Sequence, residues 1–188
     1  MAYSHRFEDA LVLAHQLHAD QTRKGTTIPY IGHLLAVAAI VIENDGTEDE
    51  ATAALLHDAV EDQGGATMRE EIRQRFGENA ATIVDGLSDT DQTPKPPWRA
   101  RKEAYLAHLS EASASVLLVS LADKIHNASS ILRDLRSEGD GVWSRFTGGR
   151  EGSLWYYRAL VDAFRARGQY TIMVEELDRI VREFEGLA

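Results

Sequence analysis

The chain has 188 residues, a length typical of one domain with a substantial hydrophobic core. Its formal net charge of −10 argues against a protein that coats nucleic acid, because such proteins usually present a broad basic face. It contains no cysteine, so disulfides and thiolate zinc sites are excluded, and any metal must be held by nitrogen and oxygen. No apolar run approaches the ~20 residues that span a bilayer, and the N-terminus does not resemble a secretory signal, so we expect a cytoplasmic protein without a membrane partner.

The sequence predicts an almost wholly helical chain. Apolar residues recur with helical spacing in most segments, and glycine or proline separates these segments. We see no strand alternation, internal repeat or heptad run. The segments predicted as helices from this spacing are 6–21, 33–43, 79–87, 98–109, 113–137, 153–167 and 170–185.

Two further helices are predicted from capping patterns. Thr47 with Glu50 forms a capping-box pattern at the start of a helix that we expect to run through the histidine-aspartate pair of LLHDAVED. Thr67 with Glu70 repeats the pattern, and Gly77 is expected to end the helix that follows.

The connecting segments are short. The most loop-like of them is SDTDQTPKPPW at 88–98, and a glycine-rich loop is expected at 139–152. None is long enough to divide the chain into domains. We therefore predict one all-α domain over residues 1–188.

A metal centre is indicated by residues from three separate apolar segments. His57 and Asp58 lie next to each other in LLHDAVED, where they are costly to bury unless something binds them. PYIGH ends in His33, and LADKIHN contains Asp123. Two imidazoles and two carboxylates would satisfy a divalent metal. This ligand set suits Mn²⁺ or Fe²⁺, and Zn²⁺ is also possible.

Glu61 and Asp62 follow the His-Asp pair by one helical turn. Because each helical residue advances about 100°, we expect Glu61 to lie nearly over His57 and Asp62 nearly over Asp58. From there both acids could orient or deprotonate a water molecule. The composition is that of a hydrolytic site.

Each candidate ligand alone has a simpler interpretation. A lone histidine near a helix start, such as His33, is commonly a capping or surface residue. Asp58 could cap a neighbouring helix or pair with an arginine, and Asp123 beside Lys124 could be a surface charge. Their combined order along the chain favours the metal centre. The other histidines do not lie in motifs with further candidate ligands, and we interpret them as solvated or core-edge residues. They are His5, His15, His18, His108 and His126.

This ordered set resembles the HD-domain phosphohydrolase superfamily. The strings RKGTTIPYIGH, ALLHDAVED and LADKIHN are similar to the RK…PYI.H, LLHDxVED and LADxxHN motifs of the alarmone-hydrolase domain in bacterial Rel/SpoT proteins. The similarity extends from about Ala14 to Ile131, and the chain has the length of that hydrolase domain alone. We therefore expect a stand-alone small alarmone hydrolase without a synthetase or regulatory region.

The resemblance implies an HD-type helical bundle that hydrolyses the 3′-pyrophosphate of guanosine 3′,5′-bis(diphosphate), ppGpp, or of pppGpp. The products would be pyrophosphate and GDP or GTP. The implied metal ligands are His33, His57, Asp58 and Asp123. The implied catalytic residues are Glu61 and Asp62, with Asp62 as the proton acceptor. The implied nucleotide contacts are Arg23, Lys24, Asn127 and Ser130, where Ser130 replaces a family threonine near the sugar.

Two departures from the family pattern leave the base open. The loop between Lys24 and Pro29 is longer than in Rel proteins, and Leu34 stands where a proline is usual. Both lie close to the expected base-binding loop. Guanine and adenine alarmones therefore both stay possible substrates.

A cluster of basic residues in an acidic chain suggests where phosphates bind. Arg forks match phosphate oxygens and Lys supplies mobile charge, although a solvated helix face would have the same composition. The cluster comprises Lys95, Arg99, Arg101 and Lys102, to which Lys124 could add. The aromatic run at 155–157 suits the core, but we expect Tyr156 to face the nucleotide.

Three readings of the function remain open at this stage. The first is the alarmone hydrolase, and the second is an HD nucleotidase or phosphodiesterase acting on another nucleotide. The third is a metal-stabilised nucleotide-sensing domain without turnover. In each case the expected partner is a small nucleotide and not a nucleic acid polymer, and the oligomeric state is left open.

Overall fold

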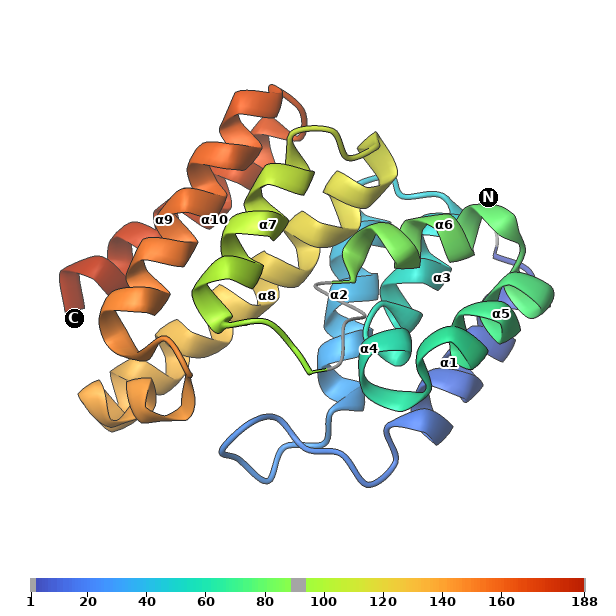
Figure 1. Ribbon diagram of the computed structural model, residues 1–188, viewed down its shortest axis with the longest axis horizontal. Coiled ribbons are helices and arrows are strands. Elements are labelled where there is room, and N and C mark those ends of the chain that lie inside the picture. The colour runs from blue at the N-terminus through green and yellow to red at the C-terminus, as the bar shows by residue number, and fades with distance from the viewer. Residues whose placement is uncertain (1–2, 89–93, 188) are drawn as a thin grey trace.

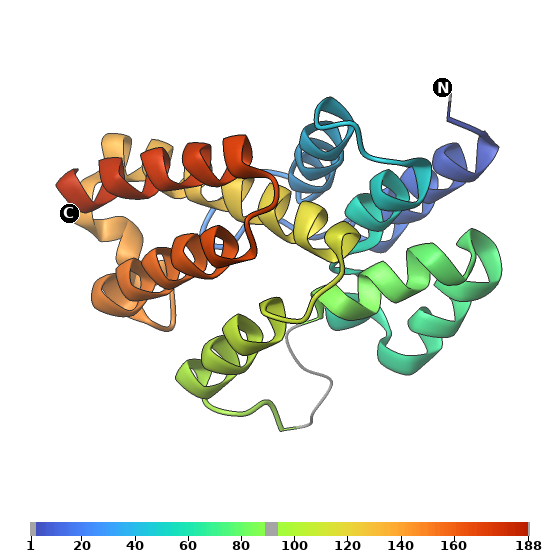
Figure 2. The ribbon, with the colours of Figure 1, turned by 90° about the horizontal axis from the view of Figure 1, so that it is seen from above.

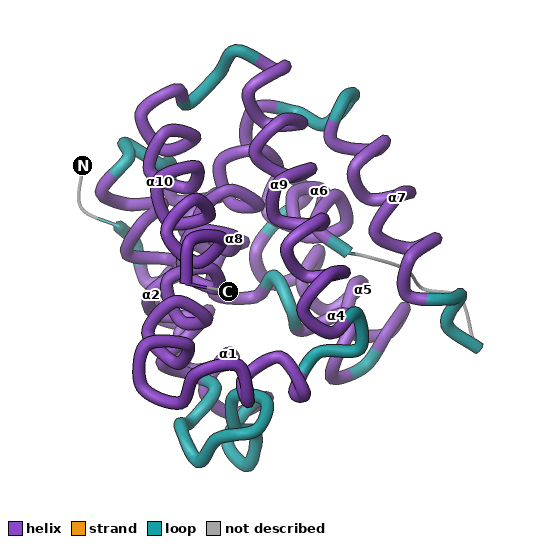
Figure 3. The backbone as a smooth tube through the Cα atoms, turned by 90° about the vertical axis from the view of Figure 1, so that its left-hand side faces the viewer, coloured by secondary structure: helices purple, strands orange, loops and turns teal. Residues whose placement is uncertain are grey.

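The computed structural model describes residues 3–88 and 94–187, which form helices, loops and an isolated bridge between Thr22 and Pro29. The α-helices are α1 (His5–Leu17), α2 (Ile31–Glu43), α3 (Glu48–Leu56), α4 (Ala59–Gln63), α5 (Gly65–Phe76), α6 (Glu78–Leu87), α7 (Trp98–Leu109), α8 (Ala114–Glu138), α9 (Gly149–Arg167) and α10 (Thr171–Leu187). A 3₁₀ helix, η1 (Gly139–Arg145), follows α8. The predicted all-α class is confirmed (Figure 3). Within the described ranges no helix has the length and apolar character to cross a lipid bilayer.

The long helix α8 organises the bundle. It packs against α2, α3 and α6 on one side and against α9, α10 and η1 on the other. Seen from above, α8 runs between the α9–α10 pair and the N-terminal helices (Figure 2). The helix α7 packs mainly on α9 (Figure 1). Residues from α2, α3 and α8 therefore meet in the middle of the molecule.

The junction of α3 and α8 is held by fully buried leucines. Leu55 and Leu56 of α3 and Leu121 of α8 have no exposed surface, and Leu117 is nearly as buried. Burying a leucine side chain contributes roughly 1.5–3 kcal/mol. These leucines precede His57 and Asp123 in sequence, so the segments that carry the candidate ligands are among the most firmly anchored.

The caps at Thr47 and Gly77 are those that the sequence predicts. The side chain of Thr47 accepts a hydrogen bond from the Glu50 backbone while the Glu50 carboxylate accepts one from Thr47, so the predicted capping box is confirmed. Ser113 caps α8 in the same manner by accepting from Val116. Gly77 ends α5 with a φ of 90°, a left-handed conformation that favours glycine.

The helix predicted to run through the histidine-aspartate pair is interrupted there. α3 ends at Leu56, His57 and Asp58 form a turn, and the short helix α4 begins at Ala59. Periodicity did not reveal the break because apolar residues continue on both sides of it. The break turns the two side chains inward together.

Three other boundary predictions were wrong. The first helix ends at Leu17 and not at 21, because the backbone N–H of His18 bonds back to Ala14 and the chain then turns. Thr67 does not cap a helix, since α5 already begins at Gly65. The predicted loop over 139–152 is largely helical, because η1 fills its first half and α9 begins before its end. In the expected loop at 88–98, residues 89–93 lie outside the described residues.

Candidate metal centre and active site

Four side chains from three elements converge at one buried point. His33 lies in the first turn of α2, His57 and Asp58 at the break before α4, and Asp123 in α8. The Nε2 of His33 lies 3.7 Å from the Oδ2 of Asp58 and 3.2 Å from the Oδ1 of Asp123. The Nε2 of His57 lies 3.0 Å and 3.7 Å from the same two oxygens. The cluster therefore brings together the four ligands that the resemblance implied.

The donor set fits a divalent cation. Ligand atoms of His33, His57 and Asp58 lie within 4.8 Å of one another, so one ion could contact all three. The buried Nε2 of His57 makes no well-aligned hydrogen bond to the described residues. Although burial opposes a charged ring, the carboxylate of Asp58 raises the pKa of His57 well above its ordinary value. A cation at this point would balance the carboxylates in place of that proton.

The ring and carboxylate orientations are set by further hydrogen bonds. The Nδ1 of His57 lies 2.8 Å from the backbone oxygen of Ala54, which leaves Nε2 facing the cluster. The hydroxyl of Tyr30 donates to the Oδ2 of Asp58 at 2.5 Å. Burial, with the charge of Asp58, raises the pKa of Tyr30, so its proton is retained as a donor. Such outer contacts orient metal ligands.

His126 is a contact that the sequence interpretation missed. Its Nδ1 lies 2.7 Å from the Nδ1 of His33, so the two imidazoles are hydrogen-bonded. Burial and the neighbouring His33 lower the pKa of His126 to about 4, so its ring is neutral. If the Nε2 of His33 binds a metal, its Nδ1 carries the ring proton and donates it to the Nδ1 of His126. Its place three residues after Asp123, on the same helix face, is a signal that could have identified it.

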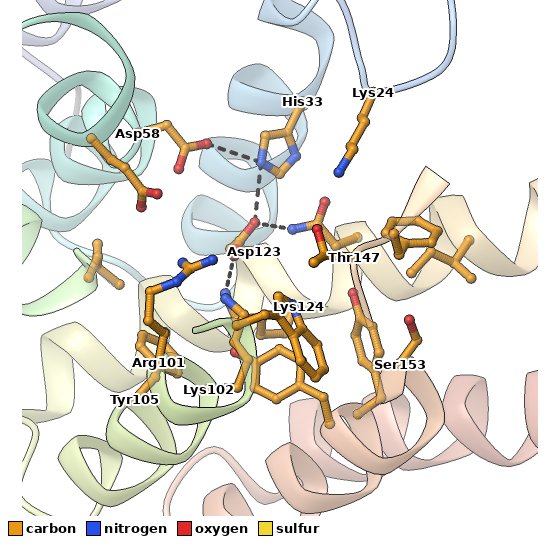
Figure 4. A pocket seen from close by; sticks show the side chains of 18 of the residues that line it. Lys24, His33, Asp58, Arg101, Lys102, Tyr105, Asp123, Lys124, Thr147 and Ser153 are labelled. Atoms are coloured by element: carbon orange, nitrogen blue, oxygen red, sulfur yellow. Dashed lines mark hydrogen bonds and ion pairs between the residues drawn. The ribbon is translucent and has the colours of Figure 1, made fainter. Parts of the chain in front are cut away.

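Asp123 connects the cluster to Lys124, Asn127 and Arg23. Its Oδ2 accepts from the ammonium of Lys124 at 2.6 Å, and its Oδ1 accepts from the amide of Asn127 at 2.5 Å (Figure 4). The oxygen of Asn127 in turn accepts from Arg23 at 2.5 Å. Burial opposes the charge of Lys124, yet Asp123 holds the pKa of this lysine well above its usual range.

The two acids after the cluster occupy different places. Glu61 lines the cavity that contains the cluster, and its carboxylate accepts from Lys95 at 2.7 Å. Asp62 is not among the described residues that line this cavity and instead borders a neighbouring cleft, where Gln21 donates to it at 2.9 Å. Burial raises the pKa of Asp62, the Gln21 bond opposes this, and the charges of Asp58 and Glu61 reinforce it. The break has thus turned Glu61, but not Asp62, toward the cavity.

Two adjoining cavities extend from the cluster. The first has a volume of about 370 Å³ and contains the cluster, Glu61 and Arg101. The second, of about 510 Å³, is lined by Arg23, Ser130 and His126 among others. The predicted substrate residues that line both cavities are Lys24, Lys102, Lys124, Asn127 and Tyr156. All eight predicted substrate residues therefore line one or both of these adjoining cavities.

The basic stretch of α7 is divided between the cavity and the surface. Arg101 and Lys102 approach the space from the side opposite His33 and Asp58 (Figure 4). The ammonium of Lys102 lies 5.2 Å from the ring centre of Tyr156. Arg99 instead pairs with Glu103 at 2.7 Å and covers the ring of Trp155, so it is not part of the cavity lining. Of these three basic residues of α7, Arg99 alone has the role of a solvated helix face.

A glycine notch holds α7 in this place. A Cβ at Gly148 would lie 2.7 Å from the Trp98 ring, and one at Gly152 would lie 3.1 Å from it. The absence of side chains there lets the first residue of α7 pack directly on the start of α9. The orientation of Arg101 therefore depends on the contact between α7 and α9.

Comparison with known proteins places this geometry in a family. The model of the HD domain matches residues 10–154. The chain belongs to the HD-domain family. The histidine-aspartate pair after which the HD domain is named is His57-Asp58 in this chain.

Its relatives are alarmone enzymes. The chain is 39% identical over 139 residues to the guanosine-3′,5′-bis(diphosphate) 3′-pyrophosphohydrolase MESH1 of Xenopus tropicalis, covering 72% of this chain and 73% of that protein. It is 34% identical over 128 residues to the bifunctional (p)ppGpp synthase/hydrolase SpoT of Escherichia coli K12, covering 65% of this chain and 17% of SpoT. A solved metazoan orthologue of SpoT that hydrolyses ppGpp matches with a TM-score of 0.80 at 29% identity, over 100% of this chain and 99% of that chain. The resemblance stated from the motifs is confirmed.

Proposed function

We propose that the protein hydrolyses the 3′-pyrophosphate of guanosine 3′,5′-bis(diphosphate) or its pentaphosphate, releasing pyrophosphate and GDP or GTP. The observation that carries the proposal is the His/Asp cluster opening directly onto a space lined by five cationic side chains, those of Arg23, Lys24, Arg101, Lys102 and Lys124. A nucleotide with two pyrophosphate groups needs such a local positive surface in a protein with a net charge of −10. The names of the MESH1 and SpoT relatives support the same substrate.

We assign the metal to His33, His57, Asp58 and Asp123, and Mn²⁺ is the ion that we propose from their nitrogen and oxygen donors. When bound, a divalent ion supplies Lewis acidity that lowers the pKa of water and polarises a phosphoryl oxygen. Tyr30 and His126 keep two of the ligands in orientation through the hydrogen bonds described above.

The chain's own residues divide the remaining work. Water adds to the phosphorus attached to the 3′ oxygen, and the bond between this phosphorus and the 3′ oxygen breaks. Pyrophosphate is released, and the 3′ oxygen takes up a proton. Asp62 accepts the proton of the water from the neighbouring cleft, where it lies close enough to Asp58 for the two charges to interact, and its raised pKa suits that role. Glu61, held by Lys95 at the cavity wall, orients the water. Lys124 and Lys102 stabilise the charge of the transferred group.

The nucleoside occupies the second cavity. Arg23, which bonds Asn127 and lies 5.7 Å from the ring centre of Tyr30, borders the base. Asn127 and Ser130 lie at the ribose. Tyr156 lies where the two cavities adjoin, since it lines both.

The decisive experiment is a product assay. Purified protein with Mn²⁺ is incubated with guanine and adenine nucleotides that carry a 3′-pyrophosphate, and the products are separated by chromatography. We expect pyrophosphate and GDP from ppGpp. Orthophosphate as the product would indicate a nucleotidase, turnover of the adenine series alone would change the assigned base, and tight binding without turnover would indicate a sensor domain.

A further inference from the structure

His18 is a buried histidine outside the metal cluster. It follows the last residue of α1, is only 2% exposed, and its ring stacks on Tyr30 with centroids 5.1 Å apart. The sequence interpretation as a solvated or core-edge residue does not account for this burial. A polar ring so far from solvent needs hydrogen-bond partners.

The partner of His18 is Gln21. The Nδ1 of His18 lies 2.6 Å from the Oε1 of Gln21. Because an amide oxygen can only accept, Nδ1 carries the proton of the ring and donates it to Gln21. The same oxygen accepts from the side-chain amide of Gln63 at 3.0 Å. Because both His18 and Gln63 donate to it, the oxygen of the Gln21 amide faces these two residues, and its nitrogen faces away from them.

The amide nitrogen of Gln21 therefore faces Asp62. Nε2 donates to the Oδ2 of Asp62 at 2.9 Å. The backbone of Gln21 is held as well, since its N–H donates to the carbonyl of His18 at 3.1 Å and its carbonyl accepts from Tyr30 at 2.9 Å. Gln21 is thus fixed at both backbone groups and at both ends of its side chain.

From this arrangement we propose that Gln21 is a positioning residue for Asp62, and that His18 sets the orientation of Gln21. The proposal rests on the proposed function, in which Asp62 accepts the proton. The bond to Oδ2 sets the rotation of the carboxylate, and so the direction of Oδ1. Asp62 is an exposed residue of a short helix, and without this bond its side chain would sample several rotamers. The misplacement of a catalytic group by about 1 Å can cost 10²-fold in rate.

The first test is Gln21→Met, which keeps the length of the side chain and removes its donor and acceptor. We expect kcat to fall by about 10- to 100-fold, the scale of a misplaced catalytic group. KM and the Mn²⁺ affinity should not change, because the side chain of Gln21 bonds His18, Gln63 and Asp62, none of which lines the cavity, and its backbone bond to Tyr30 is kept in the variant. The matched control is Gln74→Met, where the amide bonds Glu70 on the surface of α5, and it should keep wild-type kinetics.

A double-mutant cycle separates positioning from a structural role. If Gln21 acts through Asp62, Gln21→Met should cost nothing further in an Asp62→Asn background. His18→Phe keeps a ring against Tyr30 but removes the donor, so it should lower kcat in the wild type and have no effect on top of Gln21→Met. The cycle is measured on whichever 3′-pyrophosphate nucleotide the protein turns over, so a change of substrate does not decide it.

Three results would overturn the proposal. They are an unchanged kcat in Gln21→Met, an equal loss in the Asp62→Asn background, and a loss of Mn²⁺ affinity that accompanies the loss of rate. Wild-type turnover by Asp62→Asn is a different result, because it would refute the role of Asp62 in the proposed function itself.

Discussion

The two walls of the active-site space are built differently. On the metal side, His33, His57 and Asp123 are buried at 2%, 6% and 7% exposure, and they come from α2, the turn between α3 and α4, and α8, which meet in the core. On the phosphate side, Arg101 and Lys102 are only half-buried and project from α7, which packs mainly on α9. The proposed metal ligands are therefore anchored in the core, whereas the cationic residues that we propose to attract the substrate lie on a peripheral helix.

The difference teaches where each kind of change should act. Substitutions on the metal side disturb groups that are bonded to one another, so a single loss exposes several unsatisfied partners. Substitutions on the phosphate side remove one charge from a group of similar charges. We expect the first kind to abolish the reaction and the second to weaken substrate binding.

The largest effect is expected for Asp58→Ala. Metal affinity and turnover should be lost together, with turnover falling by about 10³-fold or more, since one preorganised electrostatic group alone is worth up to that amount. Metal content and kcat are measured on the same preparation. Asp9→Asn, an exposed carboxylate of α1, is the control. An enzyme that remains fully active after exhaustive chelation would contradict the metal-side assignment.

The next effect separates the two acids. Glu61→Gln and Asp62→Asn should both keep the metal, and each should lower kcat by about 10²–10⁴-fold, the usual contribution of a general acid or base. Because Glu61 lines the cavity and Asp62 does not, we expect the two variants to differ in the size of the loss in kcat. If Asp62→Asn retained turnover while Glu61→Gln lost it, the proton acceptor would be Glu61.

Sequence reasoning identified four residues that converge in the structure, because each lies in a local motif. His33, His57 and Asp123 are polar residues in apolar segments, and the burial that this position implies is what the structure shows. It failed for His126 and Gln21, since their contacts join residues 93 and 41 positions apart. No local pattern contains the contact of Gln21, whereas the three-residue spacing of His126 from Asp123 is a local signal that was overlooked.

For the fold as well, local features were predicted from the sequence and features that depend on tertiary packing were missed. Helix identity follows from apolar spacing, and the capping box at Thr47 was recognised because it is local. The break at His57 was missed, because the bonds that orient the pair come partly from Tyr30, which is distant in sequence. Which basic residues of α7 face the cavity and which face solvent depends on how Trp98 packs on Gly148 and Gly152. That packing is a tertiary property.

A smaller effect is expected for His126→Ala. His33 would lose the acceptor of its Nδ1 proton, so the ring would be less well oriented toward the metal. Loss of such an outer contact typically weakens metal affinity by about 10- to 100-fold. Titration with Mn²⁺ measures this, and saturating metal should restore much of the turnover. His126→Asn, which can still accept a hydrogen bond, should lie between the wild type and the alanine variant. An unchanged affinity in His126→Ala would assign His126 to the nucleoside cavity alone.

The smallest effect is expected on the phosphate side. Arg101→Ala and Lys102→Ala should each lower kcat/KM by about tenfold, near the lower end of the 1.5–3 kcal/mol that a charge-assisted hydrogen bond contributes. Metal affinity should not change, because neither residue belongs to the cluster. Added salt should raise KM in the wild type, and less so in these variants, since screening acts on the same charges.

Arg99→Ala is the matched control for that prediction, because Arg99 shares α7 but pairs with Glu103 away from the cavity. It should change neither kcat/KM nor the salt dependence. Melting temperatures should hardly differ among the three variants, since partly exposed charges contribute little to stability. Equal kcat/KM values for Arg101→Ala and Arg99→Ala would mean that a cationic side chain on this cavity wall does not contribute to substrate binding. The substrate charge would then have to be balanced by Arg23, Lys24 and Lys124, and the comparison between a core wall and a peripheral wall would no longer hold.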